Sequence, residues 1–374
     1  MDALVNKLID KKNERLILIS LRVGKASIID SKESMEELRL LVKTRGGKII
    51  ESKYFHRDNF DPKFLIGSGQ TEEIKKMVSE NEINTVVFDV NDISPSQIRN
   101  LEKEFNCRVS NRTEVIMDIF SRRAKSSEAK IQVELARLKY ILPRLKGQGI
   151  ELSRLGGGIG TRGPGEAMHE KDRRHILKRI DVLKAELEKV EKHRQTIRKS
   201  RENVPCGAII GYTNAGKSTL LSHLSKTELY SEDKLFATLD TFTRQIYLNP
   251  DRKLLLTDSV GFIKNMPANL VASFKSTLEE ITESDFIIHC VDISSHNIES
   301  CLNTVVKEIE SLGCSDKPVI TFFNKSDLLT EDEVNRVLIK YDNSVSGSCM
   351  IDGGLDNLKN KIMQLLDKQT ENNV

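Results

Sequence analysis

The feature that most constrains this fold is the run Gly-Tyr-Thr-Asn-Ala-Gly-Lys-Ser at residues 211–218. The run fits the pattern G-x-x-x-x-G-K-[ST], whose glycines let backbone N–H groups curl around phosphate oxygens. An apolar run at 206–210 precedes it and a helix-forming run at 218–224 follows it, which is the strand–loop–helix setting that this loop requires. In this setting Lys217 would place a positive charge at the β- and γ-phosphates, and the Ser218 hydroxyl would bind Mg²⁺.

A second motif, Asn-Lys-Ser-Asp at residues 324–327, selects the base that the site accepts. The carboxylate of Asp327 can accept hydrogen bonds from both N1–H and the exocyclic amine of guanine, and adenine would leave it unpaired. Asn324 is expected near O6 and N7 of the base, with the aliphatic stem of Lys325 over the ring. The motif ends an apolar run at 318–323, where the alternative interpretation is a polar strand-to-loop turn. The two motifs together predict that the chain binds and hydrolyses GTP.

Three weaker segments lie between and after these motifs. Asp258, at the end of an apolar run, would hold Mg²⁺ through water, and the N–H of Gly261 would contact the γ-phosphate. Thr238, in the loop 236–240, would close over Mg²⁺, and the small residues at 346–349 would approach the guanine. Each segment alone could be an ordinary loop, but their order along the chain, with apolar runs between them, predicts one nucleotide site.

The predicted site combines all of these segments. Lys217, Thr238 and Gly261 are expected to act in hydrolysis. Ser218, Thr238 and Asp258 are expected to hold Mg²⁺. The residues expected to contact the nucleotide are Gly211, Tyr212, Thr213, Asn214, Ala215, Gly216, Lys217, Ser218, Phe236, Ala237, Thr238, Leu239, Asp240, Asp258, Ser259, Val260, Gly261, Asn324, Lys325, Ser326, Asp327, Ser346, Gly347, Ser348 and Cys349.

Two positions bear on how fast this site would act. Many GTPases place a glutamine directly after the Asp-x-x-Gly motif to orient the attacking water, but Phe262 stands there in this chain. Intrinsic hydrolysis is therefore expected to be slow. Asn214 resembles the asparagine that supports K⁺ beside the phosphates in some glutamine-lacking GTPases, so K⁺ joins Mg²⁺ as a candidate cofactor. A side chain that simply caps the loop is the alternative for Asn214.

Composition limits the class of protein. With 374 residues and 38% hydrophobic content, the chain is long enough for two or three packed domains. No apolar run approaches the about 20 residues of a membrane span, and the N-terminus lacks the basic-then-apolar order of a signal peptide. None of the six cysteines forms a C-x-x-C pair, which favours buried thiols in a reducing compartment. We therefore expect a cytoplasmic monomer, with partial association at a membrane surface left open.

Positive charge is concentrated in one segment of the chain. Residues 121–201 hold 22 Lys and Arg against 10 Asp and Glu, a net charge of +12, while the whole chain carries +3, so the remaining residues carry −9. Such asymmetry indicates a polyanionic partner, of which RNA or DNA is favoured. A merely solvated helix surface is the alternative.

The same segment contains two apolar periodicities with alternating spacings of three and four. They predict two helices that pair antiparallel, the first kinked at Pro143 and the second extending from about 166 to 201, on the order of 50 Å. Their apolar residues are Ile131, Leu135, Leu138, Leu142 and Leu145, and Ile176, Ile180, Leu183, Leu187 and Val190. The stretch between the helices is too rich in glycine for regular structure. Its expected RNA-contacting residues are Arg154, Gly156, Gly157, Gly158, Gly160, Arg162, Gly163 and Gly165.

The first 120 residues alternate short apolar runs with helix-forming ones, which predicts an α/β domain with a mostly parallel sheet. The expected strands are 16–21, 48–50, 64–66, 85–88 and 108–110, and the expected helices are 34–43, 71–80 and 94–105. The whole chain is therefore expected to be α/β in class. Its expected parts are an N-terminal α/β subdomain (1–122), an antiparallel helical hairpin (123–202) and a P-loop GTPase domain with helices on both faces of a mostly parallel sheet (203–374).

The chain resembles the HflX family of translational GTPases, within the Obg-like branch, over roughly residues 15–368. The most specific part of the resemblance is Gln132-Val-Glu-Leu, Pro143-Arg-Leu and Gly158-Ile-Gly-Thr-Arg-Gly-Pro-Gly-Glu, and the run 236–240 also has the family form. The resemblance implies binding to the large ribosomal subunit and its rRNA, with the hairpin loop near the peptidyl-transferase region. It also implies that the protein separates stalled or idle ribosomes into subunits.

Some positions depart from the family pattern. The family usually continues Gly-Glu-Thr-Gln-Leu-Glu where this chain has Gly165-Glu-Ala-Met-His-Glu, and Asp-Thr-Val-Gly has become Asp258-Ser-Val-Gly. Thr241 replaces the usual proline, and the extra C-terminal domain of some members is expected to be absent. Two alternatives stay open: a GTPase in ribosome assembly or tRNA modification, and an RNA-binding protein that uses the nucleotide as a switch with negligible turnover.

Overall fold

The computed structural model describes residues 14–24, 27–147, 164–199, 204–226, 235–236, 239, 242–264, 266–267, 270, 275–295 and 297–372. The chain divides into two compact units, Met1–Lys189 with Asn265–Ser273, and Val190–Lys264 with Phe274–Val374. The three-part division at 122 and 202 stays a prediction. No helix in the described ranges combines the length and the apolar character that crossing a bilayer requires.

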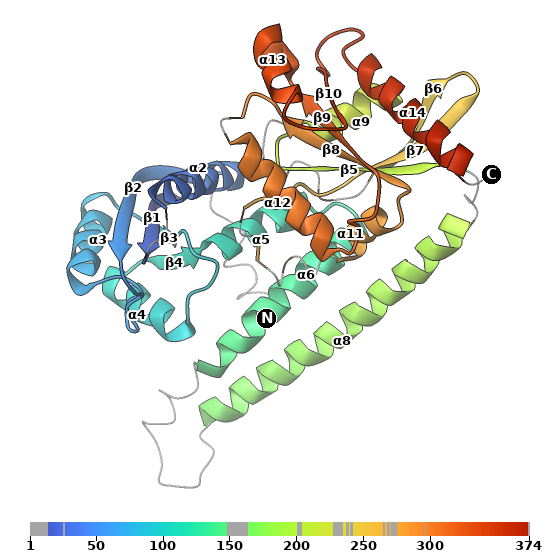
Figure 1. Ribbon diagram of the computed structural model, residues 1–374. Helices are drawn as coiled ribbons and strands as arrows, with labels where there is room; N and C mark the ends of the chain where they lie inside the picture. The colour runs from blue at the N-terminus through green and yellow to red at the C-terminus, as the bar shows by residue number, and fades with distance from the viewer. Residues whose placement is uncertain are drawn as a thin grey trace. The chain divides into compact units, whose positions relative to one another are not determined.

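The first unit contains a four-stranded sheet in the order β2-β1-β3-β4, in which every pair is parallel (Figure 1). Its strands are β1 (Arg15–Val23), β2 (Lys48–Arg57), β3 (Thr85–Phe88) and β4 (Arg108–Asn111), and its helices are α2 (Ile28–Arg45), α3 (Ser68–Glu80), α4 (Pro95–Phe105) and α5 (Arg112–Arg123). Ile74 of α3 and Leu101 of α4 pack against Ile17 and Val86 of the sheet. The parallel sheet with helical crossovers is the arrangement that the alternating pattern predicts.

The strand expected at 64–66 is a turn instead, so this prediction was wrong. The Asp61 carboxylate accepts hydrogen bonds from the N–H groups of Lys63 and Phe64 at 2.8 and 2.7 Å, which closes the turn locally. Leu65, with φ +67°, pairs back to Asp61 in an isolated bridge. Leu65 and Ile66 are nevertheless buried in the core that α3 and α4 cover. The apolar run therefore reflects burial in this core, and its backbone pairs with no strand of the described sheet.

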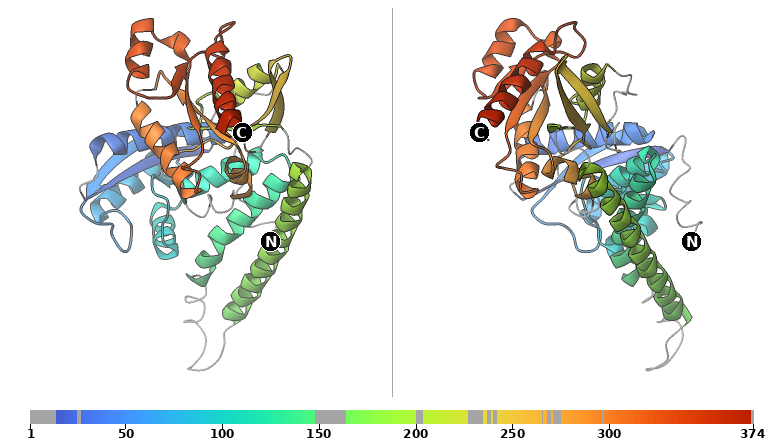
Figure 2. Two further views of the ribbon diagram at one scale, coloured as in Figure 1. Left: turned by 45° about the vertical axis from the view of Figure 1, so that its right-hand side comes forward. Right: turned by 90° about the vertical axis from the view of Figure 1, so that its right-hand side faces the viewer.

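The two predicted periodicities form a helical hairpin in the first unit. Helix α6 (Ser127–Ile141) continues into the 3₁₀ helix η1 (Leu142–Gly147), and α8 (Pro164–Lys199) lies beside α6 in each view (Figures 1 and 2). The α-helix gives way to 3₁₀ geometry at the residue before Pro143, where a kink is expected. The buried seam consists of Leu135, Leu138, Ile176, Ile180 and Leu183. The predicted pairing of the two helices is confirmed.

The second unit contains a six-stranded sheet in the order β10-β9-β8-β5-β7-β6. Its strands are β5 (Cys206–Gly211), β6 (Phe242–Asn249), β7 (Arg252–Asp258), β8 (Phe286–Asp292), β9 (Val319–Asn324) and β10 (Ser344–Ser346). Its helices are α9 (Lys217–Ser225), α11 (Lys275–Thr282), α12 (Ile298–Ser311), α13 (Glu331–Leu338) and α14 (Asp356–Asn372), with the 3₁₀ turn η2 (Ser326–Leu328). The edge strand β6 is antiparallel to β7, and the other pairs are parallel.

Helices cover both faces of this second sheet. Leu220 of α9 and Leu358 of α14 share a core with Ile288 of β8. On the opposite face, Leu302 of α12 packs against Val291 of the same strand, because successive residues of a strand point to opposite sides. The predicted class, a mostly parallel sheet with helices on both faces, is confirmed.

Candidate nucleotide-binding site

Five strands of the second unit end at one edge of the sheet. The last residues of β5, β7, β8, β9 and β10 are Gly211, Asp258, Asp292, Asn324 and Ser346. These strands are parallel, so their final residues lie along the carboxyl edge, where open α/β sheets bind their ligands. Four of these residues belong to segments predicted from the sequence, and the fifth is Asp292.

The loop between β5 and α9 has the backbone that its glycines require. Gly211 and Gly216 have φ of +153° and +92°, values that residues with a Cβ rarely adopt. A Cβ on Gly211 would overlap the Cys290 carbonyl, and one on Gly216 would overlap the Asn324 amide. Helix α9 begins directly afterwards, at Lys217, so the N–H groups of its first turn open onto this loop. Loop and helix terminus together supply the donors that an anionic phosphate needs.

Lys217 is buried beside the residues that would meet the γ-phosphate. Its Nζ donates to the Tyr212 carbonyl at 2.8 Å, and a Cβ on Gly261 would lie 2.9 Å from the same Nζ. Burial lowers the pKa of Lys217, and the nearby Asp258 carboxylate opposes this effect. A bound phosphate would favour the charged ammonium in the same way. The structure thus brings together the predicted phosphate-binding lysine and Gly261.

The residues expected to hold Mg²⁺ present a suitable donor set. The Ser218 hydroxyl donates to Oδ2 of Asp258 at 2.6 Å, and Asp258 is buried. A hydroxyl and a carboxylate fit Mg²⁺, which prefers oxygen ligands and completes its shell with water and phosphate oxygens. Among the described residues, no cluster of three or more His, Cys, Asp or Glu that could hold a metal ion is present. Thr238, the third expected ligand, lies outside the described residues.

Asn324 connects the base-selecting motif to the phosphate-binding loop. Its amide donates to the Ala215 carbonyl at 2.9 Å, and its Oδ1 accepts from the Cys349 N–H at 3.4 Å. The side chain is 3% exposed, and these contacts fix it beside the phosphate-binding loop. Its expected position near O6 and N7 of the base stays a prediction. Asp327 is exposed, where a base can reach it.

Asp292 is a functional candidate that sequence reasoning missed. Lys325 Nζ contacts Asp292 Oδ2 at 2.6 Å and donates to the Asn214 carbonyl at 3.1 Å. These two contacts hold the Lys325 side chain across the phosphate-binding loop. The predicted position of its stem over the base stays a prediction. A signal was available, because Asp292 ends an apolar strand in the same way as Asp258.

The loop after β10 lies beside the base-selecting motif. The Gly347 N–H donates to the Phe323 carbonyl at 3.0 Å, and the Gly347 carbonyl accepts from the Ser326 N–H at 3.2 Å. Ser348 and Cys349 are buried, and burial raises the pKa of the Cys349 thiol to about 12. The thiol is therefore neutral at physiological pH, and this loop is expected to meet a base through its backbone.

The segment that contains Gly261 is held to the phosphate-binding loop by its backbone. Thr213 N–H donates to the Phe262 carbonyl at 2.8 Å, and Phe262 N–H donates to the Gly211 carbonyl at 3.1 Å. The Phe262 side chain is 3% exposed. Its ring is thus packed in the core, and the position where other GTPases carry a water-orienting glutamine offers only backbone to the site.

The remaining predicted residues are either buried, outside the described ranges or, in one case, part of helix α8. Phe236, Leu239, Ser259 and Val260 are buried, and the Ser259 hydroxyl donates to a backbone carbonyl of β5 at 2.8 Å. The residues outside the described ranges are Ala237, Thr238, Asp240, Arg154, Gly156, Gly157, Gly158, Gly160, Arg162 and Gly163. Gly165 lies in the first turn of α8.

His289 on β8 should make this unit sensitive to acid. It is 2% exposed, and burial, followed by the nearby positive charge of Lys217, lowers its pKa to about 4. The unfolded chain takes up a proton near pH 6.5 and the folded chain does not, so the free energy of unfolding falls as pH drops from about 6.5 to 4, by about 1.4 kcal/mol per unit. Between pH 7.5 and 5.0 this group should cost about 2 kcal/mol of stability.

Urea unfolding of the wild-type protein and His289→Asn at these two pH values checks this expectation. The variant keeps every other titratable group. Its loss of stability on acidification therefore measures the contribution of those groups alone. It should be less stable than wild type at pH 7.5 but lose about 2 kcal/mol less on acidification. Equal losses in both proteins would contradict a buried neutral His289.

Three family models match the chain in succession. "GTP-binding GTPase N-terminal" matches residues 32–121, "GTP-binding GTPase Middle Region" matches 123–201, and "50S ribosome-binding GTPase" matches 207–325. Among solved structures, a GTP-binding protein from the hyperthermophilic archaeon Sulfolobus solfataricus in complex with GDP is 25% identical, with a TM-score of 0.46, over 95% of this chain and 99% of its own.

Relatives from several bacteria carry the name GTPase HflX. The one from Lacrimispora saccharolytica is 46% identical over 358 residues, which are 95% of this chain and 84% of the relative. The one from Escherichia coli K12 is 39% identical over 303 residues, 80% of this chain and 71% of the relative. P-loop GTPases generally use Mg²⁺, in agreement with the Ser218–Asp258 donor pair. The chain belongs to the HflX family of GTPases, and it binds guanine nucleotide and hydrolyses GTP.

Proposed function

We propose that this GTPase binds the large ribosomal subunit and separates stalled or idle ribosomes into subunits. The observation that carries the proposal is the basic helical hairpin. Helix α8 has 36 residues and is therefore about 54 Å long, and it is braced by α6 along a buried apolar seam. The segment 121–201 that contains both helices has the net charge of +12. A stiff, positively charged rod of this kind suits entry into phosphate-lined RNA.

Further support comes from the family model at residues 207–325, whose description names the 50S ribosome. Within the nucleotide site, the proposed hydrolytic residues are Lys217, Thr238 and Gly261, and the proposed Mg²⁺ ligands are Ser218, Thr238 and Asp258. The proposed rRNA contacts are Arg154, Arg162 and the glycines around them, which lie between α6 and α8 in the chain.

Sedimentation of intact ribosomes tests the proposal. Ribosomes are mixed with the protein and GTP, a non-hydrolysable GTP analogue or GDP, and the subunits are resolved on a sucrose gradient. GTP and the analogue should convert intact ribosomes into subunits, and GDP should not. Intact ribosomes in every mixture would overturn the proposal. Binding confined to free, incomplete large subunits would support a role in ribosome assembly instead.

The isolated protein should hydrolyse GTP slowly, because the residue after Gly261 is Phe262, whose buried ring cannot orient the attacking water. Large subunits should accelerate turnover by at least about tenfold, because a partner can order the catalytic site or supply a missing catalytic group in trans. Phosphate release with and without subunits measures the effect, and subunits treated with nuclease serve as the control. Equal rates with and without intact subunits would contradict this prediction.

Asn214 supports a role for K⁺ in the same site. It lies in the phosphate-binding loop with φ +66°, its side chain is exposed, and no hydrogen bond from that side chain to another described residue is found. The capping alternative thus has no partner in the described part of the chain. Turnover in KCl should exceed turnover in NaCl at equal ionic strength, and Asn214→Ala should abolish the difference. Equal rates of the wild-type protein in both salts would leave Asn214 without this role.

A further inference from the structure

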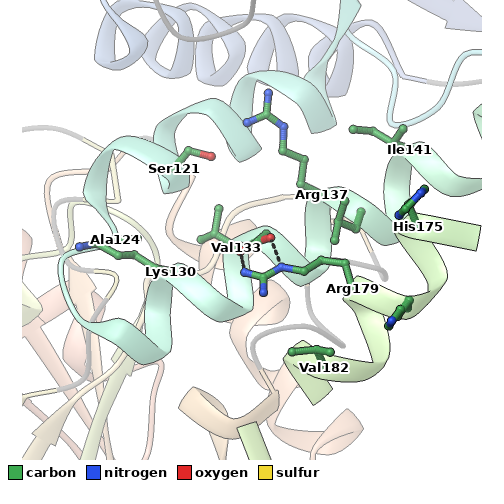
Figure 3. Close-up of a pocket in the computed structure, with 12 residues that line it drawn as sticks. Ser121, Ala124, Lys130, Val133, Arg137, Ile141, His175, Arg179 and Val182 are labelled. Atoms are coloured by element: carbon green, nitrogen blue, oxygen red, sulfur yellow. Dashed lines mark hydrogen bonds and ion pairs between the residues drawn. The ribbon is translucent and has the colours of Figure 1, made fainter. Parts of the chain in front are cut away.

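A hollow opens along the paired helices of the first unit, outside every site described above. It has a volume of about 620 Å³ and is lined by residues from the end of α5, from α6 and from the first half of α8. Figure 3 shows Arg179 of α8 reaching toward α6, with Val133, Ile141 and Val182 around the hollow. This volume is typical of a pocket that binds a ligand or the side chains of a partner.

The hollow has an apolar floor. Ala124, Val133, Leu138, Ile141 and Val182 contribute apolar side chains to it. Leu138 and Ile141 also belong to the α6–α8 seam. Val182 is 42% exposed. An exposed apolar residue beside a concave apolar surface is a feature of interaction sites.

The rim of the hollow is positively charged. Lys130 and Arg137 come from α6, and Lys178 and Arg179 come from α8. The acidic residue of the lining is Glu134, which accepts two hydrogen bonds from Arg179 at 2.7 and 2.8 Å. The two partners are 44% and 43% exposed, so this pair contributes little stability and either member can exchange partners. Lys130 and Lys178 are exposed and form no ion pair with another described residue.

The shape and the charge together distinguish between ligand classes. RNA-binding surfaces usually stack bases on aromatic rings, and none of the described residues that line the hollow is Phe, Tyr or Trp. An apolar floor gives phosphodiester groups nothing to bind. A helix that lays apolar side chains into a groove requires such a floor, and acidic residues beside its apolar stripe would meet the basic rim.

We propose that this groove binds an amphipathic helix of a partner protein, with its apolar stripe in the hollow and acidic residues against Lys130, Lys178 and Arg179. The groove-lining positions of α8, namely 175, 178, 179 and 182, follow the spacing i, i+3, i+4, i+7 and so share one face of the helix. The partner therefore contacts one face of α8 and leaves the other free. The affinity of the groove for this helix need not depend steeply on salt concentration, as RNA binding is expected to do, because part of the contact is apolar.

Selection from a displayed library of 16-residue helical peptides tests the proposal with the full-length protein. Recovered peptides should carry apolar residues at i, i+3 or i+4 and i+7, with Asp or Glu on both flanks. Fluorescence anisotropy then measures one labelled peptide against wild type and against Lys178→Glu combined with Val182→Asp. Both positions are exposed, so the variant should fold, and thermal unfolding checks that it does. The expected loss of affinity is at least tenfold.

Lys184→Glu is the matched control. Lys184 lies six residues after Lys178, on the opposite face of α8, near Lys139, whose pKa is lowered by burial and then by Lys184. This variant should bind the peptide within about twofold of wild type, because it changes the same charge outside the groove. Peptides without acidic residues, or equal binding by the groove variant, would overturn the proposal. The proposal would also be overturned if the groove variant bound the peptide normally but no longer bound a single-stranded RNA oligonucleotide. The groove would then be an RNA-binding surface.

Discussion

Replacement of Asp327 by asparagine is expected to weaken GTP binding by about 4 kcal/mol, or roughly a thousandfold, and to favour xanthosine triphosphate instead. The carboxylate is predicted to accept from guanine N1–H, and an amide NH₂ placed there would oppose that donor. Xanthine carries an oxygen in place of the exocyclic amine, so it can accept from the new amide. Asp327 is exposed, at the end of the turn that Asn324 and Lys325 anchor, so the substitution should leave the fold unchanged.

Titration of the protein with labelled GDP and with xanthosine diphosphate measures this change. Asp342→Asn is the matched control, because Asp342 is exposed in the same unit and precedes β10, at the opposite end of that strand from the nucleotide site. The control should bind GDP like wild type. If Asp327→Asn also bound GDP unchanged, Asp327 would not contact the base.

Removal of residues 156–165 is expected to abolish ribosome splitting while GTP affinity stays within about twofold of wild type. The deleted residues lie mostly outside the described ranges, and the nucleotide-site residues belong to the second unit. The milder change, Arg154→Ala with Arg162→Ala, should weaken ribosome binding, because each guanidinium can contact a phosphate or a base edge with two hydrogen bonds. Binding should also fall steeply with salt concentration, as counterions are released where the +12 segment meets RNA.

A linker of glycine and serine with the length of the deleted segment separates contact from spacing. This variant keeps the distance between α6 and α8 and retains Arg154, so it should fail to split ribosomes only if Arg162 and the original backbone make contacts. Gradients report splitting, and labelled GDP reports the nucleotide site in the same preparations. A linker variant that split ribosomes at the normal rate would mean that the hairpin is only a spacer.

The nucleotide site could largely be predicted from the sequence because its chemistry depends on local pattern. The run 211–218 needs glycine at positions of positive φ, and the structure has φ of +153° at Gly211 and +92° at Gly216. The apolar periodicities of the hairpin were equally predictable, since Leu135, Leu138, Ile176 and Ile180 repeat with the period of a helix and form its seam. Both patterns predict features of the folded protein because they depend only on residues that lie close together in the chain.

Other features are decided by contacts between residues far apart in the chain, which local patterns do not encode. The apolar run at 64–66 suggested a strand, but hydrogen bonds to Asp61 and burial in the core made it a turn. The Asn324 amide donates to the carbonyl of Ala215, 109 residues earlier, a contact that the motif at 324–327 alone does not predict. Asp292 gained its role only when the strand order placed it beside Lys325.

The sequence by itself determined which segments are predicted to bind phosphate, guanine and Mg²⁺, because each prediction depends on residue type at fixed local spacing. Only the tertiary structure decided which of these side chains contact neighbouring loops, and where the hairpin leaves an apolar hollow with a basic rim. The physical reason is that a parallel sheet brings the ends of strands separated by many residues to one edge, and helix pairing leaves some apolar side chains uncovered. Both outcomes depend on register and packing.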